Sequence, residues 1–183
     1  MAEPAVNQLA DRIPNLEVRW RAFELRPESV PPLNPDDKYI TMVWEKSVFP
    51  LAQKMGMALK IPPVQPRTRL AHEAAKSATA QGRFADYHSG IFRSFLHDGR
   101  DIGRIDVLVD IASQLQLDPD ILKRSLKRGQ YSSEVLADTS DARTLDINAV
   151  PAYLVNGKIF ATGFLPTHTL QKQLNQMLKQ LTD

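Results

Sequence analysis

The sequence predicts an α/β fold in which a long helical block separates two short regions of β-structure. Apolar and charged residues alternate over residues 16–25, the pattern of a half-buried strand. Residues 152–161 predict a β-hairpin, because two apolar runs flank Asn156-Gly157, a pair that favours a type I′ turn. Between these regions, over residues 41–130, nearly every segment has the apolar spacing of an amphipathic helix.

The expected helices follow from apolar periodicity and from residues that begin or end helices. A short helix is expected near the start of the chain, over residues 4–13, and an amphipathic helix over residues 166–181 closes it. In between, helices are expected over 43–57 with a kink or restart at Pro50, from Thr68 to a stop at Gly82, and over 83–96, 104–115, 118–126 and 133–147. Four prolines between residues 27 and 35 predict an extended, irregular connection.

Length and composition indicate one domain, or one domain with a large insertion. The chain has 183 residues, of which 43% are hydrophobic, enough to bury a substantial core. Its apolar runs are far shorter than the roughly 18 residues that a membrane span needs, and its start lacks the pattern of a signal peptide. We therefore expect a cytoplasmic protein that makes no membrane contact.

The absence of cysteine limits the chemistry available to these residues. With no cysteine, the chain has no disulfide, no thiolate metal ligand and no thiol nucleophile. The four histidines, at positions 72, 88, 97 and 168, do not have the close spacing of a metal site. We expect no metal and no cofactor, and we assign no catalytic residue.

Charge gives no reason to expect a nucleic-acid partner. The formal net charge is +2, and acidic and basic residues are interspersed along the chain. The densest basic cluster, Lys123-Arg124 with Lys127-Arg128, has i, i+4 spacing on an expected helix. We interpret this cluster as a solvated helix face.

Three stretches, taken in order, resemble the DsbA-like thioredoxin family, and in particular its cytoplasmic branch of FrnE-type oxidoreductases. They are residues 18–27, the alanine-rich helix that ends at Gly82, and residues 147–157. The resemblance implies a thioredoxin-like fold with an all-helical insertion between its two halves. It places the thioredoxin-like domain at residues 1–40 and 131–183, and the helical insertion domain at residues 41–130.

The resemblance also implies a substrate-binding site at Ala149, Val150 and Pro151. In this family the proline is cis and lies beside the reactive sulfur, and the residue before it offers backbone groups to an extended substrate. Cis peptide bonds are nearly confined to X-Pro bonds, so Val150-Pro151 is compatible with this role. An ordinary trans proline at the start of a strand is the alternative that the residues themselves leave open.

One departure from the family is large. Family members begin with a strand that leads into a Cys-x-x-Cys motif, or a serine in some relatives, and neither the strand nor the motif is present in these residues. That strand would lie between the strand expected at 17–25 and the one at 152–155, so the first core strand is absent. We expect that the natural product is longer and that Met1 is an internal methionine.

These observations leave open whether the chain belongs to an enzyme. The first hypothesis is a thiol–disulfide oxidoreductase of the DsbA and FrnE type, acting on a protein or peptide substrate, whose redox cysteines are not in this chain. A variant resembles the 2-hydroxychromene-2-carboxylate isomerases, which depend on glutathione. The other class is a non-catalytic module that binds an extended peptide, or a second copy in a homodimer, by strand addition.

Overall fold

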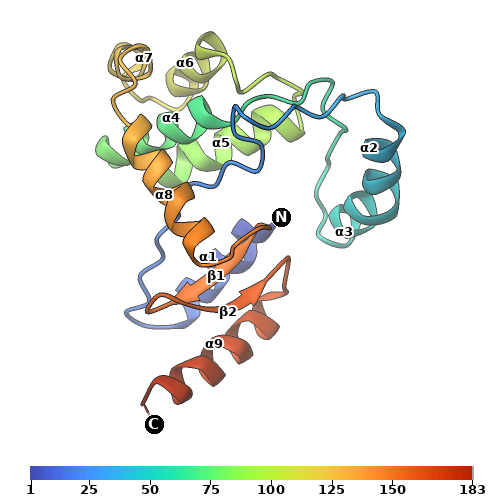
Figure 1. Ribbon diagram of the computed structural model, residues 1–183, viewed down its shortest axis with the longest axis vertical. Helices are drawn as coiled ribbons and strands as arrows, with labels where there is room; N and C mark the ends of the chain where they lie inside the picture. The colour runs from blue at the N-terminus through green and yellow to red at the C-terminus, as the bar shows by residue number, and fades with distance from the viewer. Residues whose placement is uncertain (183) are drawn as a thin grey trace. The chain divides into compact units, whose positions relative to one another are not determined.

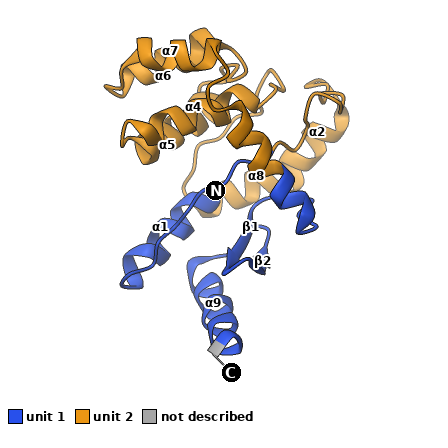
Figure 2. Cartoon of the chain, turned by 60° about the vertical axis from the view of Figure 1, so that its left-hand side comes forward, with its two compact units in different colours: residues 1–23, 140–183 blue, residues 24–139 orange. Residues whose placement is uncertain are grey.

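The computed structural model describes residues 1–182 (Figure 1). Its elements in chain order are α1 (Ala2–Arg12), α2 (Lys38–Val43), the π-helical turn η1 (Trp44–Val48), α3 (Phe49–Lys54), α4 (Arg69–Ala80), α5 (Phe84–Leu96), α6 (Ile105–Gln114), α7 (Pro119–Lys127), α8 (Ser132–Thr144), β1 (Ala152–Val155), β2 (Lys158–Thr162) and α9 (Thr167–Thr182). The chain forms two compact units: unit 1 comprises residues 1–23 and the chain from residue 140 onward, and unit 2 comprises residues 24–139 (Figure 2).

The core of unit 2 lies among α4, α5, α6 and α7. Small residues on one side of α4 allow its neighbours to approach closely, and Ala74 and Ala78 are fully buried there. Leu108 of α6 and Leu122 of α7 are also fully buried in this core. The buried Tyr87 hydroxyl donates a hydrogen bond of 2.8 Å to the Leu108 carbonyl, so the one polar atom of that ring is satisfied.

Helix α4 ends as its sequence predicts. Gly82 has a φ of +68°, the left-handed conformation that glycine adopts without steric cost. The Arg83 and Gly82 amides donate to the carbonyls of Ala78 and Thr79 at 2.9 Å each, which is the Schellman pattern.

The helix expected over residues 43–57 begins earlier and ends earlier in the structure, over residues 38–54, and comprises α2, η1 and α3. Proline lacks an amide hydrogen, so Pro50 cannot donate the i→i−4 bond of a regular α-helix. Directly before it, the Phe49 amide bonds to the Trp44 carbonyl, five residues back, which widens the helix by one π-turn. The irregularity predicted at Pro50 therefore takes the form of a π-helical turn on its N-terminal side.

Unit 1 contains the hairpin, α1 and α9. Strands β1 and β2 are antiparallel, and the turn residues Asn156 and Gly157 both have positive φ, at 49° and 76°, as a type I′ turn requires. The register shifts opposite Tyr153 and Leu154, where β2 carries one extra residue. The core of this unit joins the two ends of the chain; its buried members are Val6, Leu9, Ala161, Leu170 and Leu174.

The strand expected over residues 16–25 is not formed. Residues 16–24 have no regular secondary structure, although Leu16 and Trp20 pack against the apolar core of unit 1. The alternation therefore correctly indicated the buried sides of Leu16 and Trp20, although Val18 between them is exposed. A strand also needs a neighbouring strand in register, and the sheet of the described residues contains only β1 and β2.

None of the helices within residues 1–182 combines the length and the apolar character that crossing a bilayer requires.

Candidate functional site at the Val150–Pro151 turn

The site begins where α8 ends. Asp146 has a φ of +56°, and the Ile147 and Asp146 amides donate to the carbonyls of Ala142 and Arg143 at 2.9 Å and 3.0 Å. This is the same Schellman pattern as at Gly82, here with an aspartate in the left-handed position. Ile147 is buried and the side-chain Nδ2 of Asn148 donates to the Asp146 carbonyl at 3.1 Å, so the turn anchors the segment that leads to residue 149.

The peptide bond between Val150 and Pro151 is cis. Ala149 and Val150 are exposed, Val150 by 44%, and neither forms a hydrogen bond with any residue in the described part of the chain. Pro151 is half-buried, and its carbonyl accepts a hydrogen bond of 2.8 Å from the Gly163 amide. The backbone is therefore fixed after the proline and open to solvent before it.

Strand β1 continues directly from this turn and is paired on one side. Its partner is β2, and no further strand pairs with it within residues 1–182. In an antiparallel pair, successive residues direct their backbone groups alternately toward the partner and away from it. Since Pro151 and Val155 face β2, Ala152 and Leu154 direct their amide and carbonyl groups to the other edge. That outer edge is the geometric continuation of the exposed Val150 backbone.

The side chains beside the outer edge are apolar. Val150 and Leu154 are 44% and 38% exposed, and β1 carries no charged residue that would discourage pairing with another chain. A backbone edge with apolar neighbours can accept an extended polypeptide, with main-chain hydrogen bonds supplying affinity.

Tyr153 is the one titratable group of β1, and its position does not suit catalysis. Its ring lies 6.1 Å from the ring of Phe160, and its hydroxyl is buried without a hydrogen-bond partner in the described structure. Burial raises the pKa of the Tyr153 phenol, so the group stays protonated and packs in the interior.

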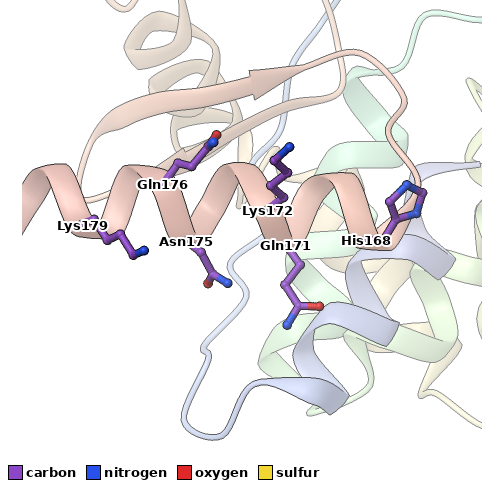
Figure 3. Close-up of a pocket in the computed structure, with 6 residues that line it drawn as sticks. All are labelled: His168, Gln171, Lys172, Asn175, Gln176 and Lys179. Carbon is purple, nitrogen blue, oxygen red and sulfur yellow. The ribbon is translucent and has the colours of Figure 1, made fainter.

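A second feature of unit 1 is a depression of about 380 Å³ along α9, lined by polar side chains (Figure 3). Its lining residues are His168, Gln171, Lys172, Asn175, Gln176 and Lys179. All six come from the same helix, so no second element encloses a ligand there. We assign no function to this depression.

Two further groups of side chains were candidates for catalysis or metal binding, His88 with its aromatic neighbours and the clusters of acids and histidines. His88 stacks on Phe84 at a ring distance of 4.9 Å and meets Phe92 edge-on at 5.0 Å, which is a packing arrangement. Among residues 1–182 no group of three or more histidine, aspartate or glutamate side chains is placed to hold a metal ion.

The structure brings Ala149, Val150 and Pro151 together at the entry to β1, as consecutive residues of one turn. The supporting roles of Asp146 and Gly163 were not predicted. A glycine directly after a predicted strand was a visible signal for Gly163, whereas nothing in the sequence marked Asp146 as a left-handed residue.

Comparison with known proteins agrees with this architecture. The chain matches the model of the DSBA-like thioredoxin domain over residues 1–175. It is 31% identical over 149 residues to the uncharacterized protein YwbO of Bacillus subtilis (strain 168), covering 79% of this chain and 74% of that protein.

Two solved structures share its fold. The probable DsbA oxidoreductase SCO1869 from Streptomyces coelicolor superposes with a TM-score of 0.77 at 22% identity, covering 96% of this chain and 82% of that one. A candidate protein disulfide isomerase from Nitrosomonas europaea gives a TM-score of 0.73 at 16% identity, covering 97% and 89%. With the family model spanning most of its length, this chain belongs to the DsbA-like thioredoxin family.

Proposed function

We propose that this chain acts in thiol–disulfide exchange on protein substrates, and that it provides the surface on which an extended substrate docks. The observation that carries the proposal is the exposed Ala149-Val150 backbone before the cis bond, continuous with the outer edge of β1. A substrate strand beside the turn would pair with the Val150 backbone, whereas the edge at Ala152 and Leu154 is where the family's first core strand would lie. Membership of the DsbA-like family supports the choice of disulfides as the reacting groups.

The thiol for this chemistry has to come from a cysteine outside these 183 residues, because they contain none. In the exchange, a thiolate attacks one sulfur of the substrate disulfide, forms a mixed disulfide and releases the other sulfur as a thiolate. The role assigned to Ala149, Val150 and Pro151 is to hold the substrate backbone during that attack.

The proposal also divides the chain into two domains. Residues 1–40 and 131–183 would form the thioredoxin-like domain, and residues 41–130 its helical insertion. A cytoplasmic location and membership of the FrnE-type branch complete the proposal, and both rest on the sequence resemblance.

A non-catalytic binding module is the second candidate. The observation that favours it is that β1 has an outer edge without a partner strand in the described residues, in a chain without cysteine. In this candidate the partner strand would pair along the whole outer edge, with Val150, Ala152 and Leu154, and there would be no turnover.

The docking surface is tested by removing one backbone donor. Val150→Pro deletes the amide of Val150, whereas Val150→Ala keeps it and serves as the matched control. Binding of a fluorescein-labelled, carboxymethylated insulin B chain is measured by fluorescence anisotropy. The loss of one hydrogen bond, about 1 kcal/mol, predicts roughly fivefold weaker binding for Val150→Pro only. Equal affinities of both variants, at unchanged melting temperatures, would refute the docking site.

Turnover separates the two candidate functions. Reduction of insulin disulfides is measured with the 183-residue chain and with the protein purified from its own cells. We expect no reduction by the 183-residue chain, since it has no thiol. Activity in the purified natural protein supports the oxidoreductase, and its absence, with peptide binding intact, supports the binding module.

A further inference from the structure

Helix α7 presents four cations on its solvent side. Its apolar side is buried in unit 2, where Leu122 and Leu126 pack against the core shared with α4 and α6. The opposite side carries Lys123, Arg124, Lys127 and Arg128, all exposed. We call these four residues the α7 basic array.

The array has no carboxylate partners within the described structure. None of its four side chains forms an ion pair or hydrogen bond with residues 1–182. Elsewhere in the same unit, exposed arginines lie beside acids: Arg83 contacts Asp86 at 2.9 Å, and Arg104 contacts Asp106 at 2.8 Å. The four neighbouring cations repel one another, with Asp120 one turn before Lys123 and Arg124 as the nearest acid on α7, and a multivalent anion would relieve that repulsion.

The spacing of the array defines the anion that fits it. The side chains form two columns, Lys123 with Lys127 and Arg124 with Arg128, each with members about 6 Å apart along the helix axis. Carboxylates at i, i+4 positions of an acidic helix have the same axial spacing, and each arginine can hold one carboxylate through two hydrogen bonds.

Other polyanions fit the array less well. The aromatic residue that follows the array, Tyr131, is half-buried, so residues 119–131 offer no fully exposed ring for a nucleic-acid base to stack on, and Asp118 and Asp120 limit the cationic surface at the start of α7. A membrane surface is disfavoured, because the apolar side of α7 is already buried and only Ile121, 42% exposed, remains beside the array.

We propose that the α7 basic array is a docking surface for an acidic helical segment of a partner protein. This surface belongs to unit 2 and shares no residue with the Val150–Pro151 turn, and the proposal does not depend on thiol–disulfide exchange.

The test compares two sets of substitutions that change the net charge equally. The array variant carries Lys123→Gln, Arg124→Gln, Lys127→Gln and Arg128→Gln. The control variant carries Lys38→Gln, Lys46→Gln, Lys54→Gln and Lys60→Gln, four exposed cations of the same unit. The probes are a fluorescein-labelled helical peptide with glutamate at every fourth position, the same peptide with glutamine there, and a labelled oligothymidine.

We expect the glutamate peptide to bind the unsubstituted chain and the control variant equally, and the array variant at least tenfold more weakly. Its affinity should fall as salt is raised, and the glutamine peptide should not bind. Equal losses in both variants would show an effect of net charge alone and would overturn the proposal. Tighter binding of oligothymidine than of the glutamate peptide, or no binding of that peptide to the unsubstituted chain, would overturn it as well. Circular dichroism melting confirms that each variant is folded.

Discussion

In unit 2, helices that are close in the chain enclose the core, whereas the core of unit 1 joins segments from the two ends of the chain. Helices α4 to α7 follow one another directly, and twelve buried residues, Ala71 to Leu126, form one cluster among them. In unit 1, Val6 and Leu9 of α1 pack with Leu170 and Leu174 of α9. Unit 1 therefore depends on contacts of long sequence separation, which carry the larger loop-closure cost.

The two units also differ in what they leave exposed. The β1 strand of unit 1 has one unpaired edge within the described residues, and the apolar side chains of Val150 and Leu154 are more than a third exposed beside it. In unit 2, the exposed large apolar side chains between α4 and α7, Phe92 at 45% and Ile121 at 42%, lie on helices, whose backbone groups are paired within the helix. Unit 2 is thus organised around packing, and unit 1 offers an edge that can accept another chain.

Truncating one leucine in each unit tests this difference in burial, and it has the largest expected effect. Leu122 is fully buried in the core of unit 2, so Leu122→Ala should lower the free energy of unfolding by about 2–5 kcal/mol. Leu154→Ala should cost about 1 kcal/mol, because that side chain is already 38% exposed. Urea denaturation followed by circular dichroism measures both. Similar losses would mean that Leu154 is buried in solution, for example by a second chain on β1.

The two units also show why some elements could be predicted and others could not. Helices α4 to α7 were predicted, because apolar periodicity and Gly82 are local signals. The strand over 16–25 was wrongly predicted, because alternation indicates which side of a segment is buried and not whether a partner strand lies beside it. Sequence periodicity therefore predicts an element well when its contacts are with residues nearby in the chain, and poorly when they are with distant residues.

The same reasoning applies to the candidate site. Ala149, Val150 and Pro151 were named through a family resemblance, since their own sequence is compatible with an ordinary strand start. The Gly163 amide that holds the Pro151 carbonyl could not be deduced, because the pairing across the hairpin depends on the one-residue irregularity in β2.

A smaller effect, on the pH dependence of stability, distinguishes the buried tyrosines of the two units. Burial raises the pKa of Tyr87 strongly and raises the pKa of Tyr153 as well. Both phenols are protonated in the folded and unfolded chain at neutral pH, so their contribution is fully present there. Above the ordinary tyrosine pKa of about 10, the unfolded chain ionises first and stability falls with rising pH.

We therefore expect the free energy of unfolding to decline between pH values of about 9 and about 11, and the decline to be reduced by Tyr87→Phe more than by Tyr153→Phe. Urea denaturation at several pH values measures the slopes. Since Tyr87 donates to the Leu108 carbonyl, Tyr87→Phe should also cost about 1 kcal/mol at neutral pH. If neither substitution altered the slope of the free energy of unfolding against pH, groups other than these two tyrosines would cause the loss of stability at alkaline pH.

The smallest predicted effects concern the two Schellman turns, one in each unit. Gly82→Ala places a β-carbon at a φ of +68° and should destabilise the protein by about 1 kcal/mol, although no atom lies within 4 Å of the added carbon. Asp146→Gly relieves the same strain at a φ of +56°, and the added freedom of the unfolded chain offsets part of the gain, so stability should rise by less than about 1 kcal/mol. Thermal melting compares the two variants. If Asp146→Gly were instead destabilising and also weakened binding of the carboxymethylated insulin B chain, the aspartate side chain would be needed to hold the turn before Val150, and the two helix ends would differ in function as well as in sequence.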